Sequence, residues 1–360
     1  MEKFSIGLGF TSTCNMNCPF CYSKNKRSSN DDCGLDSWVK FIDANYLYIK
    51  DINYGTSENA TSNNWYDFIV RIRDSYPHIR QAVTTNGSLG FMASESIEKK
   101  KIIIRCIDEV DVSIDFGDAN VHNKYRGNPN AFEWALKTLN FCGETGKAAT
   151  IVMLGIDETI NESNLNMIFA LAKKYNAVVR MNLYRPVEST SKIKPVSLDK
   201  IDWLFMWIEK NHRFLSVSDS LFSCLYFNGY HRSDPSGVSS LRIIPNGDIF
   251  PSTYLLSEEL KMGNISNFLL EQITENPVYK RIRQLNIPED CVECSYSAMC
   301  RGGVLDRRYL WYGSFAMRDP YCPYRDENSV IVDNFGKCHI SNSDFCSVHD
   351  GYLPTLFFGA

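Results

Sequence analysis

The sequence has no long apolar run and no excess of basic charge. None of its stretches reaches the roughly 18 consecutive apolar residues that a membrane span requires, and the N-terminus carries no secretory signal. The 38 lysines and arginines are outnumbered by 42 aspartates and glutamates and are scattered along the chain, which disfavours a nucleic-acid binder. These absences predict a soluble, cytoplasmic protein with no membrane partner and no nucleic-acid partner.

The composition also argues against a disulfide framework. Thirteen cysteines in 360 residues are too sparse for a small disulfide scaffold. They gather in two places, and this is the pattern of metal ligation in a reducing compartment. We therefore expect the positions of the cysteines to identify the chemistry.

Strand-like and helical patterns alternate over the first two thirds of the chain. Apolar, β-rich runs recur at residues 5–10, 46–54, 80–85, 110–115, 150–154 and 178–184. Amphipathic helical patterns lie between them, with clear examples at residues 63–76 and 201–208. Such alternation implies right-handed parallel βαβ units, and six of them predict an α/β fold, a partial (β/α)6 barrel of the TIM type. The active site is then expected at the carboxyl ends of the strands.

The character of the sequence changes after about residue 216, where glycine, proline and serine interrupt the helical period. We expect residues 1–220 to form the barrel and residues 221–325 to form a small, loop-rich module held by an iron–sulfur cluster. Residues 326–360 form a C-terminal tail without a clear period, and the sequence does not indicate its role.

A loop directly after the first predicted strand carries three cysteines and lacks a fourth. Cys14, Cys18 and Cys21 follow a C-x3-C-x2-C spacing. Three thiolates leave one iron of a [4Fe–4S] cluster open, and an open iron can chelate the amine and carboxylate of an amino acid, whereas a structural site needs its fourth protein ligand. The alternatives are a zinc knuckle and a fortuitous group of cysteines. Zinc sites, however, usually pair two C-x2-C units, and Cys33 is poorly spaced as a fourth ligand.

This loop resembles the signature of the radical S-adenosylmethionine (SAM) superfamily, C-x3-C-x-(aromatic)-C after the first strand, with Phe20 at the aromatic position. The resemblance implies that Cys14, Cys18 and Cys21 bind a catalytic [4Fe–4S] cluster and that SAM ligates its unique iron. Electron transfer from a flavodoxin- or ferredoxin-type donor would cleave SAM to a 5′-deoxyadenosyl radical, which abstracts a hydrogen atom from the substrate.

Segments at the ends of later strands resemble the SAM-binding segments of this family. The run Gly55, Thr56, Ser57, Glu58 is similar to the GGE-type segment that meets the SAM amine, with Thr56 replacing a glycine. By itself it could be an ordinary β-to-α turn with a capping serine. Arg126 stands where the family's arginine commonly pairs with the SAM carboxylate, but it could equally be a solvated loop cation. The further cofactor-binding candidates are Asn86 in a Thr-Asn-Gly turn, Ser113 and Asp115 on the polar face of the fourth strand, and Asn182 on the sixth.

A second group of cysteines lies near the end of the predicted cluster module. Cys291, Cys294 and Cys300 follow a C-x2-C-x5-C spacing, a Gly-Gly pair comes soon after, and Cys322 follows. The pattern resembles the C-terminal part of a SPASM domain, the auxiliary-cluster module of radical SAM maturases. It implies one auxiliary [4Fe–4S] cluster with no open iron, and a zinc site is the alternative.

A complete SPASM domain holds two clusters, and the cysteines expected for the other cluster are missing here. Ser252 ends a G-x4 spacing where a cysteine would stand, and Val304 stands where C-x3-C would place another thiolate. We therefore expect the first auxiliary cluster to be absent. Cys224, Cys338 and Cys346 are left over, and free cysteines of this kind are commonly small, buried apolar residues.

Radical SAM proteins with SPASM modules mostly modify ribosomally made peptides by crosslinking, epimerisation or oxidation, and the resemblance implies that function here. The alternative is a small-molecule dehydrogenase or epimerase acting on a sugar or aminocyclitol, with Cys224 as the candidate hydrogen donor. The chain opens directly on the first strand and leaves no room for a leader-binding domain of about 80–90 residues, so a separate leader-peptide recognition protein is a further expected partner. A redox or iron-sensing protein without SAM chemistry is the third hypothesis, and the segment at residues 55–58 argues against it.

Overall fold

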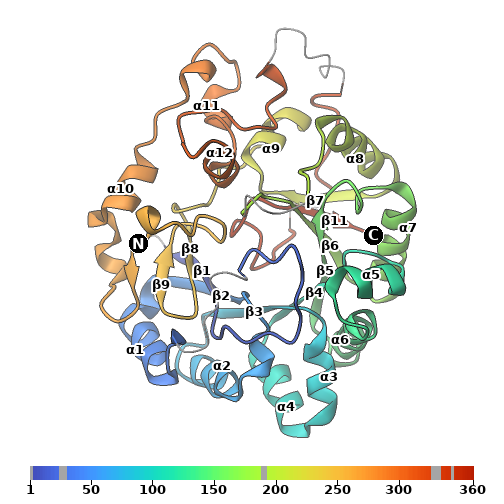
Figure 1. Ribbon diagram of the computed structural model, residues 1–360, viewed down its shortest axis with the longest axis vertical. Coiled ribbons are helices and arrows are strands. Elements are labelled where there is room, and N and C mark those ends of the chain that lie inside the picture. The colour runs from blue at the N-terminus through green and yellow to red at the C-terminus, as the bar shows by residue number, and fades with distance from the viewer. Residues whose placement is uncertain (1–2, 24–30, 188–192, 326–333, 342–343) are drawn as a thin grey trace.

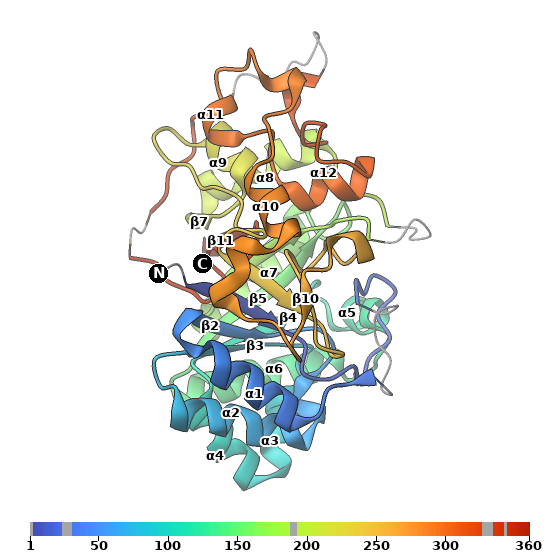
Figure 2. The ribbon, with the colours of Figure 1, turned by 90° about the vertical axis from the view of Figure 1, so that its left-hand side faces the viewer.

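The computed structural model describes residues 3–23, 31–187, 193–325, 334–341 and 344–360. Within these residues, one open sheet of 11 strands runs in the order β10-β9-β8-β1-β2-β3-β4-β5-β6-β11-β7 (Figure 1). The sheet curves into a partial barrel with helices on its outer face. Helices α1–α4 lie at one end of the molecule, and α9, α11 and α12 lie at the other (Figure 2).

The first six strands are parallel neighbours in chain order, as the alternation of patterns predicts. They are β1 (Phe4–Leu8), β2 (Ile49–Tyr54), β3 (Arg80–Thr85), β4 (Glu109–Ser113), β5 (Ala148–Gly155) and β6 (Val178–Leu183). Residues 46–48, expected as the start of the second strand, instead form a 3-10 turn, η3 (Tyr46–Tyr48). The expected partial α/β barrel is therefore confirmed.

Helices follow these strands and cover the outer face of the barrel. They are α1 (Leu35–Asn45), α2 (Asn63–Ser75), α3 (Ser88–Glu95), α4 (Ile97–Cys106), α5 (Ala119–Arg126), α6 (Ala131–Thr145), α7 (Glu162–Lys174) and α8 (Leu198–Asn211). Side-chain caps fix several helix starts; the Asn161 side chain, for example, accepts from the Asn164 N–H at 2.9 Å. None of the described helices is long and apolar enough to cross a membrane.

The two faces of β1 explain how the barrel keeps an interior space. Ile6 and Leu8 point away from the barrel interior, into the hydrophobic core between the sheet and the helices. Each fully buried aliphatic side chain there contributes roughly 1.5–3 kcal/mol to the stability of the fold. The alternate residues Ser5, Gly7 and Gly9 have small or absent side chains, so they leave room on the inner face. The inside of the barrel can therefore hold side chains from elsewhere in the chain.

The chain beyond α8 adds strands to both ends of the sheet. Its elements are β7 (Arg213–Val217), α9 (Ser220–Tyr226), β8 (Ser240–Ile243), β9 (Asp248–Phe250), β10 (Gly263–Asn264), α10 (Pro277–Arg283), α11 (Ser297–Cys300), α12 (Leu305–Tyr312) and β11 (Leu356–Gly359). Strand β8 pairs in parallel with β1, whereas β11 lies antiparallel between β6 and β7. Part of the tail predicted at residues 326–360 is thus an interior strand of the sheet.

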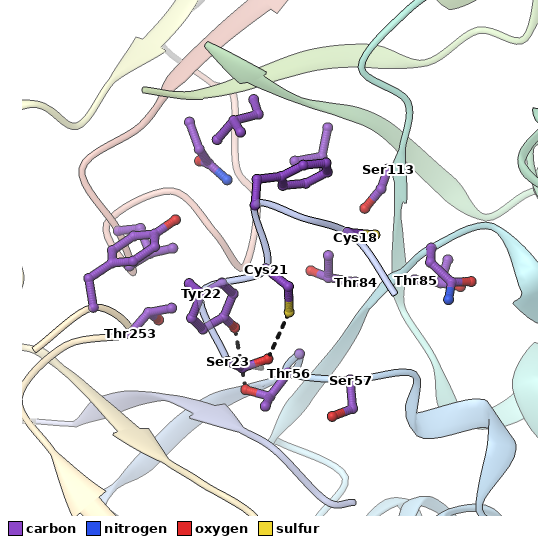
Figure 3. A pocket seen from close by; sticks show the side chains of 18 of the residues that line it. Cys18, Cys21, Tyr22, Ser23, Thr56, Ser57, Thr84, Thr85, Ser113 and Thr253 are labelled. Carbon is purple, nitrogen blue, oxygen red and sulfur yellow. Dashed lines mark hydrogen bonds between the residues drawn. The ribbon is translucent and has the colours of Figure 1, made fainter. Parts of the chain in front are cut away.

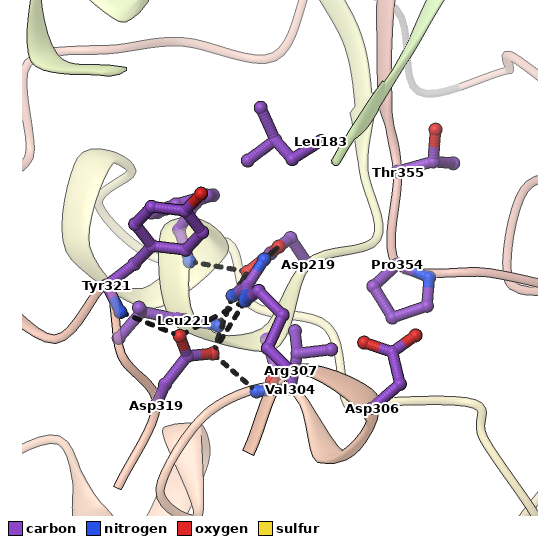
Figure 4. A network of polar contacts seen from close by, with 12 residues as sticks. Leu183, Asp219, Leu221, Val304, Asp306, Arg307, Asp319, Tyr321, Pro354 and Thr355 are labelled. Carbon is purple, nitrogen blue, oxygen red and sulfur yellow. Dashed lines mark hydrogen bonds and ion pairs between the residues drawn. The ribbon is translucent and has the colours of Figure 1, made fainter. Parts of the chain in front are cut away.

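Buried ion pairs join α12 to its surroundings (Figure 4). Arg307 donates from Nη1 and Nη2 to the Asp219 carboxylate, whose Oδ1 also caps the start of α9. The same guanidinium donates from Nε and Nη2 to Asp319 Oδ2, at 2.9 and 2.6 Å. Asp319 Oδ2 also accepts from the Val304 N–H at 2.8 Å. One arginine therefore holds three segments of the C-terminal half together.

Candidate active site

A cavity of about 210 Å³ opens at the carboxyl ends of the barrel strands (Figure 3). Parallel strands bring the segments that follow them to one edge of the sheet, which is where an α/β barrel places its active site. The lining residues come from the loops after β1, β2 and β3, from β4–β6, and from the C-terminal half of the chain.

The three cysteines of the first loop line this cavity together, as the sequence predicts. Cys14, Cys18 and Cys21 are reduced thiols. Cys18 Sγ donates to the carbonyl oxygen of Arg126 at 3.6 Å, and Cys21 Sγ lies 3.3 Å from the Ser23 hydroxyl. Burial raises the pKa of the Cys18 thiol, and the nearby Arg126 guanidinium partly opposes that rise.

The arrangement of these thiols fits an iron–sulfur cluster. In the part of the chain that the structure describes, no three His, Cys, Asp or Glu side chains converge on one point as the ligands of a single ion. A [4Fe–4S] cluster requires no such convergence, because each thiolate binds a different iron of the cube. Three thiols facing one cavity therefore supply a suitable ligand set and leave one iron without a protein ligand.

The aromatic residue of the cysteine loop packs against α5. The ring of Phe20 stacks on Tyr125 with a centroid distance of 4.3 Å, and the Arg126 guanidinium lies 5.1 Å from the Phe20 centroid. Phe20 also lines the cavity. These contacts connect the loop after β1 to the helix after β4 and limit how far the cysteines can move.

The segment after β2 has an unusual backbone. Thr56 and Ser57 have φ angles of 65° and 61°, in the left-handed region that side-chain-bearing residues rarely adopt. Both line the cavity together with Gly55, and the Thr56 hydroxyl lies 3.3 Å from the Tyr22 hydroxyl. The turn therefore lies at the cavity, where the sequence predicts the contact with the SAM amine.

Glu58 occupies a different place from its neighbours in that segment. Its side chain is fully buried, and in the described part of the chain it does not line the cavity. Its Oε2 accepts from the Thr85 hydroxyl at 2.9 Å and from the Asn86 N–H at 2.8 Å, and its own N–H donates to the Thr13 carbonyl. Burial raises the pKa of this carboxyl to about 7. Glu58 thus positions the turn after β3 and the start of the cysteine loop.

Asn86, which the sequence singles out in the Thr-Asn-Gly turn, reaches the cysteine loop directly. Its Nδ2 donates to Asn15 Oδ1 at 2.7 Å and lies 3.8 Å from Cys14 Sγ. Its Oδ1 accepts from the Ser88 N–H and hydroxyl, which fixes the orientation of the amide. Asn86 therefore connects the end of β3 to the first cysteine.

Arg126 and Asp115 form a buried ion pair at the cavity wall. Arg126 donates from Nε and Nη2 to Asp115 Oδ2, at 2.7 and 2.6 Å. The other oxygen of Asp115 accepts from the Leu154 N–H at 2.9 Å. Both residues line the cavity, as does Ser113. Arg126 is therefore not a solvated loop cation, and its guanidinium is held beside the cysteine loop by Asp115.

The sixth strand presents a polar face to the same cavity. Asn182 lines it and accepts a hydrogen bond from Thr355 Oγ1 at 2.8 Å. Arg180 also lines it and lies 3.1 Å from the Asp111 carboxylate. The Thr355 contact shows that the C-terminal segment helps to position a residue predicted for the cofactor.

Part of the cavity wall comes from residues that the sequence did not identify. His349, Tyr352 and Leu353 belong to the C-terminal segment, Thr253 and Tyr254 follow β9, and Arg242 lies on β8. His349 Nδ1 lies 2.6 Å from Asp111 Oδ2, and burial lowers the pKa of the imidazole to about 4, so it is neutral near pH 7. One feature of the sequence could have pointed to this part of the cavity wall: Arg242 is a charged residue inside the short apolar run of β8.

Tyr352 reaches β1 across the inside of the barrel. Its hydroxyl lies 2.8 Å from Thr253 Oγ1. A Cβ atom added to Gly7 would stand 1.6 Å from the Tyr352 hydroxyl oxygen, so only glycine can occupy position 7 while Tyr352 is in place. The C-terminal segment is therefore fitted to the inner face of β1.

The second group of cysteines also surrounds one hollow. Cys291, Cys294, Cys300 and Cys322 all line a small cavity next to α9, together with tyrosine and arginine side chains. Burial raises the pKa values of Cys291, Cys300 and Cys322. The four thiols that the sequence assigns to one auxiliary cluster therefore lie together.

The positions expected for a further cluster are filled by protein. Ser252 and Val304 are both buried, and the Ser252 hydroxyl accepts from the Tyr254 N–H at 3.4 Å. Cys224 is buried on α9, and burial raises the pKa of its thiol to about 11. Among the described residues Cys224 does not line the main cavity, so the structure does not bring the candidate hydrogen donor to the site.

Comparison with protein families gives a match over the barrel. Residues 8–167 match the radical SAM superfamily. The chain contains a radical SAM domain. The match runs from the end of β1 into α7 and contains the three-cysteine loop, the turn after β2 and Arg126. Such a domain implies SAM and a [4Fe–4S] cluster as cofactors of this radical SAM enzyme.

Two curated relatives of this radical SAM enzyme cover most of the chain. The antilisterial bacteriocin subtilosin biosynthesis protein AlbA of Bacillus subtilis is 24% identical over 318 residues, which are 82% of this chain and 66% of AlbA. The AdoMet-dependent heme synthase of Methanosarcina barkeri is 25% identical over 353 residues, which are 89% of this chain and 96% of the synthase. The chain thus spans slightly less than two thirds of the length of AlbA.

Solved radical SAM structures share the fold beyond the barrel. Streptococcus suis SuiB bound to precursor peptide SuiA has a TM-score of 0.68 at 15% identity, covering 89% of this chain and 76% of SuiB. The protein anSMEcpe with bound AdoMet and a Kp18Cys peptide has a TM-score of 0.66 at 16% identity, covering 88% of this chain and 93% of anSMEcpe. These likenesses extend through the cysteine-bearing C-terminal half, and the expected SPASM-like region is confirmed as a fold.

Proposed function

We propose that this radical SAM enzyme modifies a ribosomally made peptide, with its catalytic cluster on Cys14, Cys18 and Cys21. One observation carries the proposal: the three cysteines, the turn after β2, Asn86 and the Asp115–Arg126 pair all meet at one cavity. When bound there, the cluster and SAM would supply a radical that removes a hydrogen atom from the substrate. A peptide substrate is supported by the fold shared with SuiB and anSMEcpe, both of which have been solved with peptides.

The residues of the chain would hold and orient these cofactors. Asn86 and the carbonyl of Arg126 contact the cysteine loop, and Glu58 fixes the turn that carries Asn86. Gly55, Thr56 and Ser57 would meet the SAM amine through backbone groups, while Ser113, Asp115 and Asn182 would contact the rest of SAM. Tyrosine side chains and the C-terminal segment cover the other side of the cavity, where they would limit the access of water.

An auxiliary [4Fe–4S] cluster on Cys291, Cys294, Cys300 and Cys322 is the second part of the proposal. Four thiolates leave no open iron, so this centre would relay electrons or hold the loops together. An electron donor of flavodoxin or ferredoxin type and a separate leader-peptide recognition protein are the proposed partners.

A small-molecule substrate is the second candidate. The observation that favours it is the similarity to the M. barkeri AdoMet-dependent heme synthase, which is 25% identical over 89% of this chain. A genomic neighbourhood distinguishes the two candidates: a short peptide gene beside this one favours peptide maturation, whereas sugar- or cofactor-processing genes favour the small molecule.

Anaerobic reconstitution with SAM and dithionite tests the radical chemistry. The wild-type enzyme should yield 5′-deoxyadenosine, and Cys18→Ala should abolish it because the cluster loses a ligand. Cys346→Ala, at an exposed cysteine outside the cavity, should retain the yield and serves as the matched control. No 5′-deoxyadenosine from wild-type protein with a fully loaded cluster would refute the proposal.

Iron and sulfide analysis tests the number of clusters. Two [4Fe–4S] clusters predict about eight irons per chain, and three predict about twelve. Cys294→Ala should lower the iron content by about four while the visible absorption of the remaining cluster persists. A value near twelve would contradict the assignment of Ser252 and Val304 as lost ligands.

A further inference from the structure

Arg242 is a buried cation that lacks a carboxylate partner in the described part of the protein. It lies on β8 with 1% exposure and lines the main cavity. Burial disfavours its charge, whereas Tyr22, Tyr352 and Tyr254 around it raise its pKa, Tyr352 also through a side-chain hydrogen bond. Its Nε and Nη2 have no hydrogen-bond partner among the residues described. A buried charge without a partner destabilises the folded protein, so binding of an anionic ligand by this guanidinium would be favourable.

Three of the other buried arginines among the described residues, Arg126, Arg185 and Arg307, show what Arg242 lacks. Arg126 uses Nε and Nη2 to bind Asp115, and Arg307 uses Nε and Nη2 to bind Asp319. Arg185 binds Asp306 through Nε at 2.6 Å. In an arginine side chain, Nε and Nη2 form one edge of the planar guanidinium, and this edge matches the two oxygens of a carboxylate. Arg126 and Arg307 use this edge for a carboxylate, whereas the same edge of Arg242 is buried and has no hydrogen-bond partner among the described residues.

The surroundings of Arg242 suit an anionic group. The Tyr352 hydroxyl and Thr253 Oγ1 are 2.8 Å apart beside it and can donate to a ligand oxygen. Burial, with smaller contributions from Arg180 and Arg242, lowers the pKa of His349 to about 4, so the imidazole is neutral near pH 7 and does not repel Arg242. The Nη1 of Arg242 points toward the ends of β1 and β2, where it stands 2.9 Å from the place of a Cβ on Gly7.

We propose that Arg242, together with Tyr352, forms a subsite that binds a carboxylate group of a molecule occupying the main cavity. This inference relies on the proposed function only in taking the cavity as the active site. Two molecules could supply the carboxylate, the substrate or the methionyl part of SAM. Gly55 of the turn after β2 lies near the same guanidinium, with a hypothetical Cβ 3.6 Å from Arg242 Nη1, so both sources are within reach of the site.

The test uses the full chain with its clusters reconstituted, in anaerobic calorimetry and thermal unfolding. One arm titrates propionate and propionamide, which differ in charge but little in shape. The other arm titrates SAM and decarboxylated SAM. The proteins are the wild type, Arg242→Gln, and Arg73→Gln as a control, since Arg73 pairs with Asp108 on the outside of the barrel.

If the substrate supplies the carboxylate, propionate should bind the wild type and Arg73→Gln but bind Arg242→Gln at least about tenfold more weakly, while the SAM affinity stays unchanged. If SAM supplies it, Arg242→Gln should weaken SAM by about tenfold or more and leave decarboxylated SAM unaffected. The proposal is overturned if the wild type does not distinguish propionate from propionamide and Arg242→Gln leaves the ratio of SAM to decarboxylated SAM affinities unchanged.

Two further readouts keep the test decisive. If Arg242→Gln does not fold, the wild-type comparisons of propionate with propionamide, and of SAM with decarboxylated SAM, still decide whether a carboxylate is recognised. Formation of 5′-deoxyadenosine is measured in parallel. Carboxylate binding without SAM cleavage would refute the proposed function but support the subsite. SAM cleavage without carboxylate recognition would refute the subsite but support the proposed function.

Discussion

At the scale of single residues, the buried carboxyl of Glu58 destabilises the folded protein when it is charged, but it holds the turn after β3 in position. Its carboxyl is fully buried, and this burial raises its pKa from 4.5 to about 7 although Asn86 and Thr85 donate to the charged form. A raised pKa means that the folded state favours the protonated acid, so the associated stability is present below pH 4.5 and is lost as the pH rises through 7. The shift corresponds to about 3 kcal/mol.

Glu58→Gln should therefore stabilise the cofactor-free protein at alkaline pH. A glutamine can still accept from Thr85 and Asn86 but carries no charge to bury. We expect its free energy of unfolding to exceed that of the wild type by up to about 3 kcal/mol at about pH 8 and by less than about 1 kcal/mol at about pH 5, measured by urea unfolding. Glu95→Gln, at the exposed end of α3, should show no such pH dependence. An equal gain at both pH values would contradict the assignment.

The sequence located the cysteines of the site and Arg126, but not Arg242. Three cysteines on one short loop must lie together wherever the loop folds, so their spacing alone groups Cys14, Cys18 and Cys21. Arg242 faces the same cavity from a strand far along the chain, and no local pattern shows which strand β8 will join. Arg242 is a candidate ligand-binding residue because its Nε and Nη2 have no hydrogen-bond partner among the described residues, and only the three-dimensional structure shows this.

At the scale of secondary-structure elements, the strand β11 changes the architecture of the barrel. It inserts between β6 and β7 and forms hydrogen-bonded ladders with both. Phe358 is fully buried and packs near Phe214 and Phe169, at centroid distances of 5.5 and 6.2 Å. The strand therefore fastens the C-terminal segment that lines the cavity.

Phe358→Ala should destabilise the protein by about 3–5 kcal/mol, because it removes a large buried side chain and leaves a cavity. Chemical denaturation of the cofactor-free protein measures the loss. Leu47→Ala is the matched control, since Leu47 is 53% exposed and its truncation should cost no more than about 0.5 kcal/mol. A cost for Phe358→Ala as small as that of the control would show that β11 is not an integral strand.

The strands that were predicted and those that were missed differ in how clearly their hydrophobic pattern marks their boundaries. The strands β1–β6 are flanked by amphipathic helices, so their boundaries show as changes of period. Strand β11 is four residues long and buried on both faces, so Leu356, Phe357 and Phe358 give an apolar run with no alternation. Strand β7 follows α8 after a single residue and was not separated from it.

At the scale of the whole molecule, the hydrogen-bonded sheet crosses the boundary expected near residue 220. Strand β8 from the C-terminal half pairs with β1 at the N-terminus, and β11 pairs with β6. Arg307 then joins α9, α12 and the segment that carries Cys322 through Asp219 and Asp319. The division at residues 220 and 325 stays a prediction, but these contacts couple the barrel to the cysteine-bearing region.

Arg307→Met should cost about 3–5 kcal/mol of stability, because it leaves two buried carboxylates without their cation. Lys280→Met removes an exposed pair with Glu275 and should cost less than about 1 kcal/mol. Urea unfolding of both variants beside the wild type makes the comparison. We also expect Arg307→Met to lose auxiliary-cluster iron more readily. A variant as stable as the wild type would show that the network does not hold α9, α12 and the Asp319 segment together.

Tyr352 packs against Gly7, so two residues from opposite ends of the chain meet inside the barrel. Position 7 leaves the ribosome long before the tyrosine that fills the space beside it. Chains fold from the N-terminus as they are made, so the barrel strands can pair while the cavity still lacks one wall. The wall that Tyr352 contributes is therefore among the last parts of the cavity to be synthesised.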